Sequence, residues 1–420
     1  MTSRERVICT LNHQEPDKTP IDIGAGPTTG MHASTVYKLR RALGLPPQPV
    51  RVIDCYQMLG EIDDELSSVL DIDTVKVIDQ TSSFGFNMDN WKEWTLFDGT
   101  PVLVPEKFNT KPNSDGSIFN YPLGDPTAAP SGLMPKGGYY FDGIIRQRII
   151  DDDALDVEDN LEEFTLYTDE QLRYLEKHVE DAYTCTCKAI LGTPAGCALG
   201  DIALVPGVFL KDPKGIRDIE EWYMSIITRQ SYIQELFSRQ TDIALENLRL
   251  YREAVGDKVV AVYLCGADFG TQNSQFCSKD LFREMYMPYY QKMTTWIHQN
   301  TSWKVFKHSC GAVEPLIGSF VEAGFDILNP VQCSAANMDP SLLKKNYGND
   351  IVFWGGGVDT QRTLPFGTIE EVERQVQDLL KIFKPNGGFI FSAVHNIQAG
   401  VPAENVIAMI ETFRQYRAYT

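Results

Sequence analysis

The chain has 420 residues, of which 43% are hydrophobic and 23% are charged, a composition that is ordinary for a globular protein. Its formal net charge of −19 argues against binding to nucleic acid or to an anionic membrane surface, because both require basic patches. No apolar run of about 18 residues occurs, no apolar signal core opens the sequence, and nine cysteines are scattered through it, so we expect a reduced, cytoplasmic protein without a transmembrane helix.

The N-terminal half of the sequence predicts elements without a regular alternation. We expect a short helix at residues 4–12, strands at 19–23 and 73–78, and a helix at 58–70 between these strands. Asp98-Gly99 lies between two apolar runs and predicts a hairpin turn.

A stretch rich in Pro, Gly, Asn and Ser follows the hairpin, over residues 105–143. A structureless loop of this length is unusual inside a compact domain, so we interpret residues 94–143 as a β-rich insertion or lid. Residues 151–163 are strongly acidic, and we expect them to be solvated. No internal repeat is found, and we expect residues 1–420 to form one domain around this insertion.

From residue 259 onward, short apolar runs alternate with helical patterns. We expect strands at 259–264, 304–308, 326–329, 351–354 and 388–394, and helices near 278–299, 313–322, 340–345, 369–383 and 403–416. Strict alternation predicts parallel strands joined by helical crossovers. The pattern alone fits both a (β/α)8 barrel and an open doubly wound sheet.

Reactive side chains follow the predicted strands at their C-terminal ends, where α/β barrels build active sites. In chain order these are His32, Asp268, Gln272, His308, Cys310, Gln332, Asp359 and His395. The carboxylates of Asp268 and Asp359 could anchor a substrate or transfer protons, and the alternative for both is to cap a loop.

The segment His308-Ser309-Cys310 predicts a metal site. In an extended segment residues i and i+2 point to the same side, so His308 and Cys310 can bind one ion, and His395 can supply a third ligand from another strand end. A thiolate with two imidazoles favours zinc, and an open fourth position is typical of a catalytic zinc. The alternative is a buried His–Cys pair held by backbone hydrogen bonds.

Several motifs occur in an order that resembles one family over essentially the whole chain. They are Arg4-Glu5-Arg6-Val7, Glu15-Pro16-Asp17-Lys18-Thr19-Pro20, Phe269-Gly270-Thr271-Gln272, His308-Ser309-Cys310-Gly311, Gly324-Phe325-Asp326-Ile327-Leu328-Asn329 and Pro402-Ala403-Glu404-Asn405-Val406. These resemble the uroporphyrinogen decarboxylase superfamily, and specifically its corrinoid-dependent methyltransferase branch. The resemblance implies a (β/α)8 barrel, the α/β architecture that the pattern alone leaves open.

Zinc methyltransferases of this branch hold their metal with a His-x-Cys pair and a later Cys. His308 and Cys310 match the pair, and His395 stands where the later Cys is expected, which makes the site less electron-rich. The decarboxylases proper have an arginine-rich entrance after the first strand, whereas the loop Gly24-Ala25-Gly26-Pro27-Thr28-Thr29-Gly30 has no arginine. This departure argues against decarboxylation of a porphyrinogen.

We therefore expect a methyltransferase that moves a methyl group between a small methylated substrate, or a thiol or folate acceptor, and a separate corrinoid protein. The expected roles are metal binding for His308, Cys310 and His395, catalysis for Asp268 and His395, and substrate binding for His32, Gln272, Gln332 and Asp359. The partner is expected to be separate because no corrinoid-binding signature occurs, and a homodimer is one assembly that the sequence allows. The main alternative is a metal-independent decarboxylase of a small carboxylated substrate, with Asp268 or His395 as proton donor. A barrel that only binds a ligand is the third reading.

Overall fold

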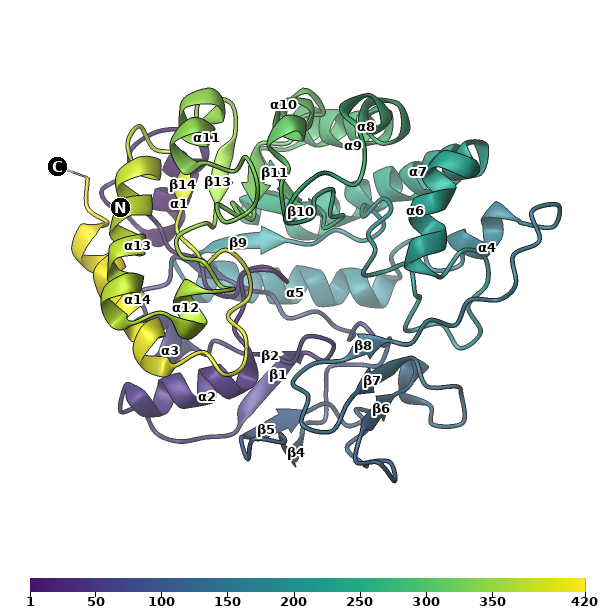
Figure 1. The fold of residues 1–420 in the computed structure, drawn as a ribbon, viewed down its shortest axis with the longest axis horizontal. Helices are drawn as coiled ribbons and strands as arrows, with labels where there is room; N and C mark the ends of the chain where they lie inside the picture. Colours follow the sequence, from purple (N-terminus) through teal and green to yellow (C-terminus); the bar gives the residue numbers. More distant parts are fainter. Residues whose placement is uncertain (420) are drawn as a thin grey trace.

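Seven parallel strands form one curled sheet at the centre of the computed structural model, which describes residues 1–419 (Figure 1). In spatial order they are β14 (Phe389–Ile390), β13 (Val352–Trp354), β12 (Ile327–Asn329), β11 (Lys304–His308), β10 (Ala261–Cys265), β9 (Ala189–Gly192) and β3 (Thr74–Val75). Each strand pairs with its neighbours in parallel, as the predicted alternation requires.

The segment around Ile21 takes the eighth position and closes the sheet into a barrel. Ile21 forms a parallel bridge with Phe391, and the Asp22 N–H donates to the Phe391 carbonyl. On the other side the Asp73 N–H donates to the Ile21 carbonyl. The predicted strand at 19–23 is therefore present only as a short bridge, but the (β/α)8 barrel is confirmed.

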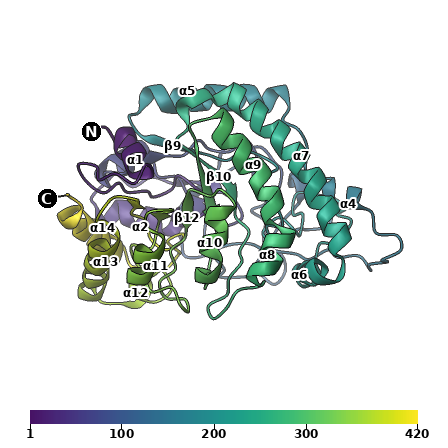
Figure 2. The same ribbon diagram turned by 90° about the horizontal axis from the view of Figure 1, so that it is seen from above.

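Helices surround the barrel (Figure 2). They include α5 (Asp169–Cys185), α7 (Gln230–Val255), α9 (Met287–Asn300), α10 (Glu314–Glu322), α11 (Pro340–Tyr347), α13 (Ile369–Phe383) and α14 (Ala403–Tyr416), and α1 (Ser3–Leu11) contacts β9 and β14. Helix α13 shows why they form where they do: Thr368 and Glu371 make a reciprocal capping box, and an apolar stripe that includes Val372, Val376 and Phe383 is buried. Each such buried side chain stabilises the fold by roughly 1.5–3 kcal/mol relative to exposure.

Further helices complete the connections. They are α2 (Ala33–Ala42), α3 (Asp64–Val69), α4 (Val157–Leu161), α6 (Ile219–Thr228), α8 (Lys279–Met285), α12 (Thr363–Phe366) and the 3-10 turns η1 (Pro122–Gly124) and η2 (Gly256–Lys258). Among residues 1–419, none of the helices combines the length and the apolar character that crossing a lipid bilayer requires.

Two small sheets lie beside the barrel (Figure 1). One contains β2 (Leu59–Gly60), β1 (Val50–Asp54), β5 (Pro101–Val104) and β4 (Lys92–Thr95), and the other contains β6 (Ile118–Asn120), β7 (Gly132–Met134) and β8 (Asp142–Gly143). The hairpin of β4 and β5 turns at Asp98-Gly99, where Gly99 has a φ of +83°. That residues 94–143 act as a separate insertion or lid stays a prediction.

Several sequence expectations are wrong in detail. Of the strands expected at 73–78 and 388–394, only Thr74–Val75 and Phe389–Ile390 form. The helix expected at 58–70 begins only after Asp63, whose carboxylate caps it, because Leu59–Gly60 pairs with β1. The helix expected at 278–299 is divided near Tyr286, just before Pro288, which cannot donate a backbone hydrogen bond. The acidic stretch 151–163 is not solvated throughout, since Glu163 is buried beside the fully buried Arg217.

The sequence analysis predicted no helix or strand in residues 164–258. This segment supplies β9 and helices α5, α6 and α7, and without it the barrel would be incomplete. Strand β9 is too short to show a period, and α5 has only one fully buried residue, Val179, so its apolar face is narrow.

Candidate metal centre and active site

A layer of apolar side chains fills the inside of the barrel below the site. It includes Ala261 and Phe306, together with Leu191, Ile327, Val352, Trp354 and Ile390. Tyr263 and His308 each follow a member of this layer by two residues, so they stand on the same inward face, one level nearer the mouth. Strand alternation thus places the His308 imidazole at the C-terminal end of the barrel.

Three potential ligands meet at this mouth: His308 at the end of β11, Cys310 two residues later, and His395 in the loop after β14. Their ligand atoms all lie within 4.8 Å of one another. The distance from His308 Nε2 to Cys310 Sγ is 3.4 Å, and the two imidazole centroids are 5.4 Å apart. Two ligands of a tetrahedral zinc ion lie about 3.6 Å apart, so the donor set fits zinc.

The His308 ring is fixed by a hydrogen bond on the side away from Cys310. Its Nδ1 lies 2.6 Å from Asn329 Oδ1, and Asn329 Nδ2 in turn donates to the Trp354 carbonyl at 2.8 Å. Because the amide oxygen can only accept, Nδ1 carries the proton and Nε2 keeps a free lone pair toward Cys310. Such an outer partner is what orients a metal-binding histidine.

Burial sets the protonation of the three side chains. It lowers the pKa of His308 to about 3 and that of His395 to about 4, so both imidazoles are neutral near pH 7, the form that binds a metal. Burial, followed by the nearby Asp268 carboxylate, raises the pKa of Cys310 well above its ordinary value. A divalent cation would reverse this effect and favour the thiolate.

Asp268 adjoins the centre on its more open side. The Cys310 N–H donates to Asp268 Oδ1 at 2.6 Å, and the same oxygen lies 3.7 Å from His308 Nε2. The Asp268 side chain is 27% exposed, so it can reach both the centre and a ligand in the mouth. This position suits a proton-transfer group or a further metal ligand.

Gln332 and Gln272 are placed differently. Gln332 Oε1 accepts a hydrogen bond from the Gly311 N–H at 2.8 Å and holds the turn after Cys310. Gly311 has a φ of +88°, and a Cβ there would lie 2.5 Å from the backbone of Gly270, so the two loops touch. Gln272 is exposed at the rim.

The hydrogen bonds of the His32 and Asp359 side chains are with backbone groups. His32 Nδ1 accepts from the Ser34 N–H and caps α2, while its Nε2 lies 2.7 Å from the Tyr139 carbonyl. Asp359 Oδ1 accepts from the backbone N–H groups of the two residues Gln361 and Arg362. The structure does not bring either side chain to the three ligands, and their substrate contacts stay predictions.

Several side chains that the sequence reading missed stand near the centre. Asp201 follows β9, Tyr263 lies on β10, and Tyr223 lies on α6. Lys307 is fully buried, and its Nζ donates to the carbonyls of Ala267 at 2.6 Å and His308 at 2.5 Å. Asp201 could have been considered had β9 been predicted, since it lies in the loop that follows that strand.

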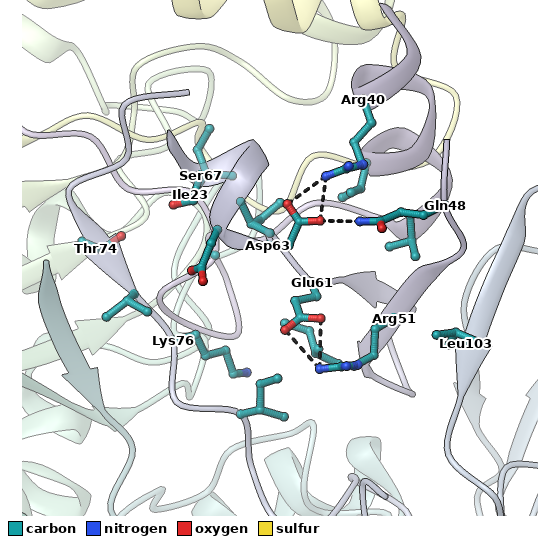
Figure 3. Close-up of a pocket in the computed structure, with 18 of the residues that line it drawn as sticks. Ile23, Arg40, Gln48, Arg51, Glu61, Asp63, Ser67, Thr74, Lys76 and Leu103 are labelled. Carbon is teal, nitrogen blue, oxygen red and sulfur yellow. Dashed lines mark hydrogen bonds and ion pairs between the residues drawn. The ribbon is translucent and has the colours of Figure 1, made fainter. Parts of the chain in front are cut away.

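A cavity of about 470 Å³ lies apart from this centre, on the flank of the barrel between β3 and the sheet that contains β1 (Figure 3). Two ion pairs lie in its wall: Arg40 Nη1 lies 2.6 Å from Asp63, and Arg51 Nη1 lies 3.3 Å from Glu61. None of the three ligands lines it.

Comparisons with known proteins agree on the fold. Residues 210–416 match the model of the uroporphyrinogen decarboxylase (URO-D) family. A solved methyltransferase from Methanosarcina mazei is similar, with a TM-score of 0.55, 14% identity and 99% of each chain covered, a likeness that shows the fold alone. A B12-independent methionine synthase from Shewanella sp. W3-18-1 aligns with a TM-score of only 0.38 at 12% identity, over 83% of this chain and 84% of that one, which carries no argument. No curated protein matches the chain.

Proposed function

Since the chain belongs to the uroporphyrinogen decarboxylase superfamily, we propose that it is a methyltransferase, moving a methyl group between a small substrate and a separate corrinoid protein. The proposal includes a zinc ion held by His308, Cys310 and His395. The observation that carries it is the meeting of these three ligand atoms within 4.8 Å at the barrel mouth.

The chemistry of the mouth supports methyl transfer to or from a heteroatom. Zinc bound there would act as a Lewis acid on the oxygen or sulfur that carries the methyl group. Asn329 keeps the His308 Nε2 lone pair available, and Asp268 lies beside Cys310 at the side where a substrate can enter. The solved Methanosarcina methyltransferase has the same fold over nearly its whole length, which adds support.

A metal-independent decarboxylase is the second candidate. The family match is to a decarboxylase, and the Asp268 carboxylate raises the pKa of the nearby His395, opposing the stronger effect of burial. These two side chains could share a proton-transfer step. Against this candidate, the loop from Gly24 to Gly30 has no arginine to hold carboxylates.

Metal analysis and a cobalt assay test the proposal together. Protein purified without chelator should contain about one zinc per chain, as expected for one His–Cys–His site. Reduced free cobalamin, used as the probe, should become methylated in the presence of the protein and a methyl donor, seen as a change in cobalt absorbance. Protein that lacks a transition metal, or that releases carbon dioxide without any cobalt dependence, would contradict the proposal.

A further inference from the structure

Asp201 and Tyr263 form an oxygen pair beside the metal centre. A Cβ at Gly266 would lie 2.6 Å from Asp201 Oδ2 and 2.6 Å from the Tyr263 hydroxyl, so the two oxygens lie no more than twice that distance apart. Only a glycine at 266 leaves room for both groups.

The pair belongs to the same mouth as the metal ligands but does not touch them. Tyr263 lies one strand away from His308, and their rings are stacked with centroids 6.3 Å apart. Asp201 lies in the loop that follows β9, whereas the ligands follow β11 and β14. Loops that follow parallel barrel strands meet at one mouth, so Asp201 and a substrate bound at the metal would share this mouth.

The Asp201 carboxyl group has no cationic partner. No Lys or Arg side chain in residues 1–419 makes an ion pair with it, and the Lys307 ammonium group, whose charge lowers the pKa of Asp201, already donates to two backbone carbonyls. Burial, with a smaller contribution from Asp268, raises the pKa of Asp201. The other titratable groups that face it are the Cys265 thiol and the hydroxyls of Tyr263, Tyr223 and Tyr290.

Tyr223 adds a third polar side chain beside Asp201 and Tyr263. Its hydroxyl is buried without a hydrogen-bond partner within the described part of the chain, and burial, followed by the charges of Asp268 and Asp201, raises the pKa of Tyr223. The Tyr223 ring stacks on Phe276 with centroids 4.7 Å apart. A ligand with one hydroxyl or ether oxygen would satisfy this buried donor.

We propose that Asp201 is the proton donor of this site and that the methyl donor is an O-methyl compound. This inference rests on the proposed methyl transfer. An alkoxide or phenoxide leaves readily only if it is protonated, whereas a thiolate needs no such help. The metal ligands agree with this choice, because two neutral imidazoles and one thiolate leave a metal more Lewis-acidic than a site with two thiolates would, and oxygen is the harder ligand.

The proposed step transfers the methyl group from oxygen to cobalt. The bond from the methyl carbon to oxygen breaks, and both electrons stay on the oxygen. The methyl carbon bonds to the electron pair of the reduced cobalt(I) of the partner corrinoid, which becomes methylcobalt(III). The proton moves from Asp201 Oδ2 to the leaving oxygen, which gives a hydroxyl product and the Asp201 carboxylate, and water later returns the proton.

The test compares two methyl aryl ethers as probes, with reduced free cobalamin as the acceptor. Methoxybenzene leaves as a weakly acidic phenol, and 4-nitromethoxybenzene leaves as a much more acidic one. In the metal-loaded Asp201→Asn variant, the rate with methoxybenzene should fall roughly 100-fold, whereas the rate with the nitro probe should fall less than about threefold. Asp201→Glu should restore part of the methoxybenzene rate, and the limb where the wild-type rate declines with rising pH should disappear in Asp201→Asn.

Controls separate this role from a structural one. Each variant should keep the wild-type zinc content, measured by elemental analysis, and the surface variant Asp378→Asn should match the wild type on both probes. Equal losses on the two ethers, or none, would overturn the role of Asp201. Methylation of cobalamin from S-methyl probes but not from either ether would overturn the O-methyl inference and leave the proposed function standing. Failure with every probe would overturn both.

Discussion

The barrel mouth and the flank cavity are both polar and half-buried, but their charges are arranged in opposite ways. In the flank cavity each guanidinium has a carboxylate within ion-pair distance, as Arg51 has Glu61. At the mouth, Asp201 and Asp268 have no Lys or Arg partner in residues 1–419, and the two imidazoles are kept neutral by burial. Paired charges stabilise a surface, whereas unpaired groups that converge on one point are available to a metal or a substrate.

The largest effect that this comparison predicts is at His395. His395→Ala should lose the metal and roughly 100-fold of activity, because one of three ligands is removed. It should cost less than about 1.5 kcal/mol of unfolding free energy, since little apolar volume is lost. His395→Cys should keep the metal, because a thiolate is also a zinc ligand. Normal metal content and turnover in the Ala variant would contradict the predicted ligand role.

A pH effect on stability should be the next largest. The pKa values of His308 and His395 fall from the ordinary 6.5 to about 3 and about 4 on folding, so between these values the unfolded chain binds more protons than the folded one. The metal-free protein should therefore lose stability as the pH falls from 6.5 toward 4. Urea unfolding at pH 7 and pH 5 measures this loss.

A His395→Gln variant separates the contribution of His395 to the pH dependence of the unfolding free energy from that of all other titrating groups. This variant should lose less stability than the wild type between the same two pH values. An identical pH dependence in both proteins would show that His395 is not the cause.

The smallest effect should be in the flank cavity. Arg51→Ala and Glu61→Ala should each change the unfolding free energy by about 1 kcal/mol or less, because the pair is partly exposed and screened by solvent. Activity and zinc content should stay within about twofold of the wild type. A large loss of activity in either variant would mean that the flank cavity, and not only the mouth, takes part in the chemistry.

The sequence predicted the C-terminal half of the fold closely because strand and helix alternate there without interruption. The strand at 304–308 and the helices at 369–383 and 403–416 have their predicted bounds. The meeting of His308, Cys310 and His395 followed from the same regularity, since the C-terminal ends of parallel strands share one edge.

The other parts of the fold and of the site depend on features that the hydrophobic periodicity of the sequence does not reveal. Strand β9 has four residues, so Asp201 had no predicted strand end to follow. The hydrogen bonds that cap α2 with His32 and the turn at Asp359 depend on loop conformations that a single sequence leaves open. A helix was predicted from residue 58, but Leu59 and Gly60 instead form a short strand that pairs with β1.

The contact between Gly311 and Gly270 has a consequence for anyone who wishes to redesign this enzyme for other substrates. The Ala312 N–H donates to the Thr271 carbonyl, and the side-chain Nε2 of Gln275 donates to the Ala312 carbonyl, so one backbone and one side-chain hydrogen bond interlock the loops after β10 and β11. A mutational library that varies either glycine would be depleted of folded members. Diversity is better introduced at the rim residues Gln272 and Phe276, where side chains are exposed and the interlocked backbone would be inherited unchanged.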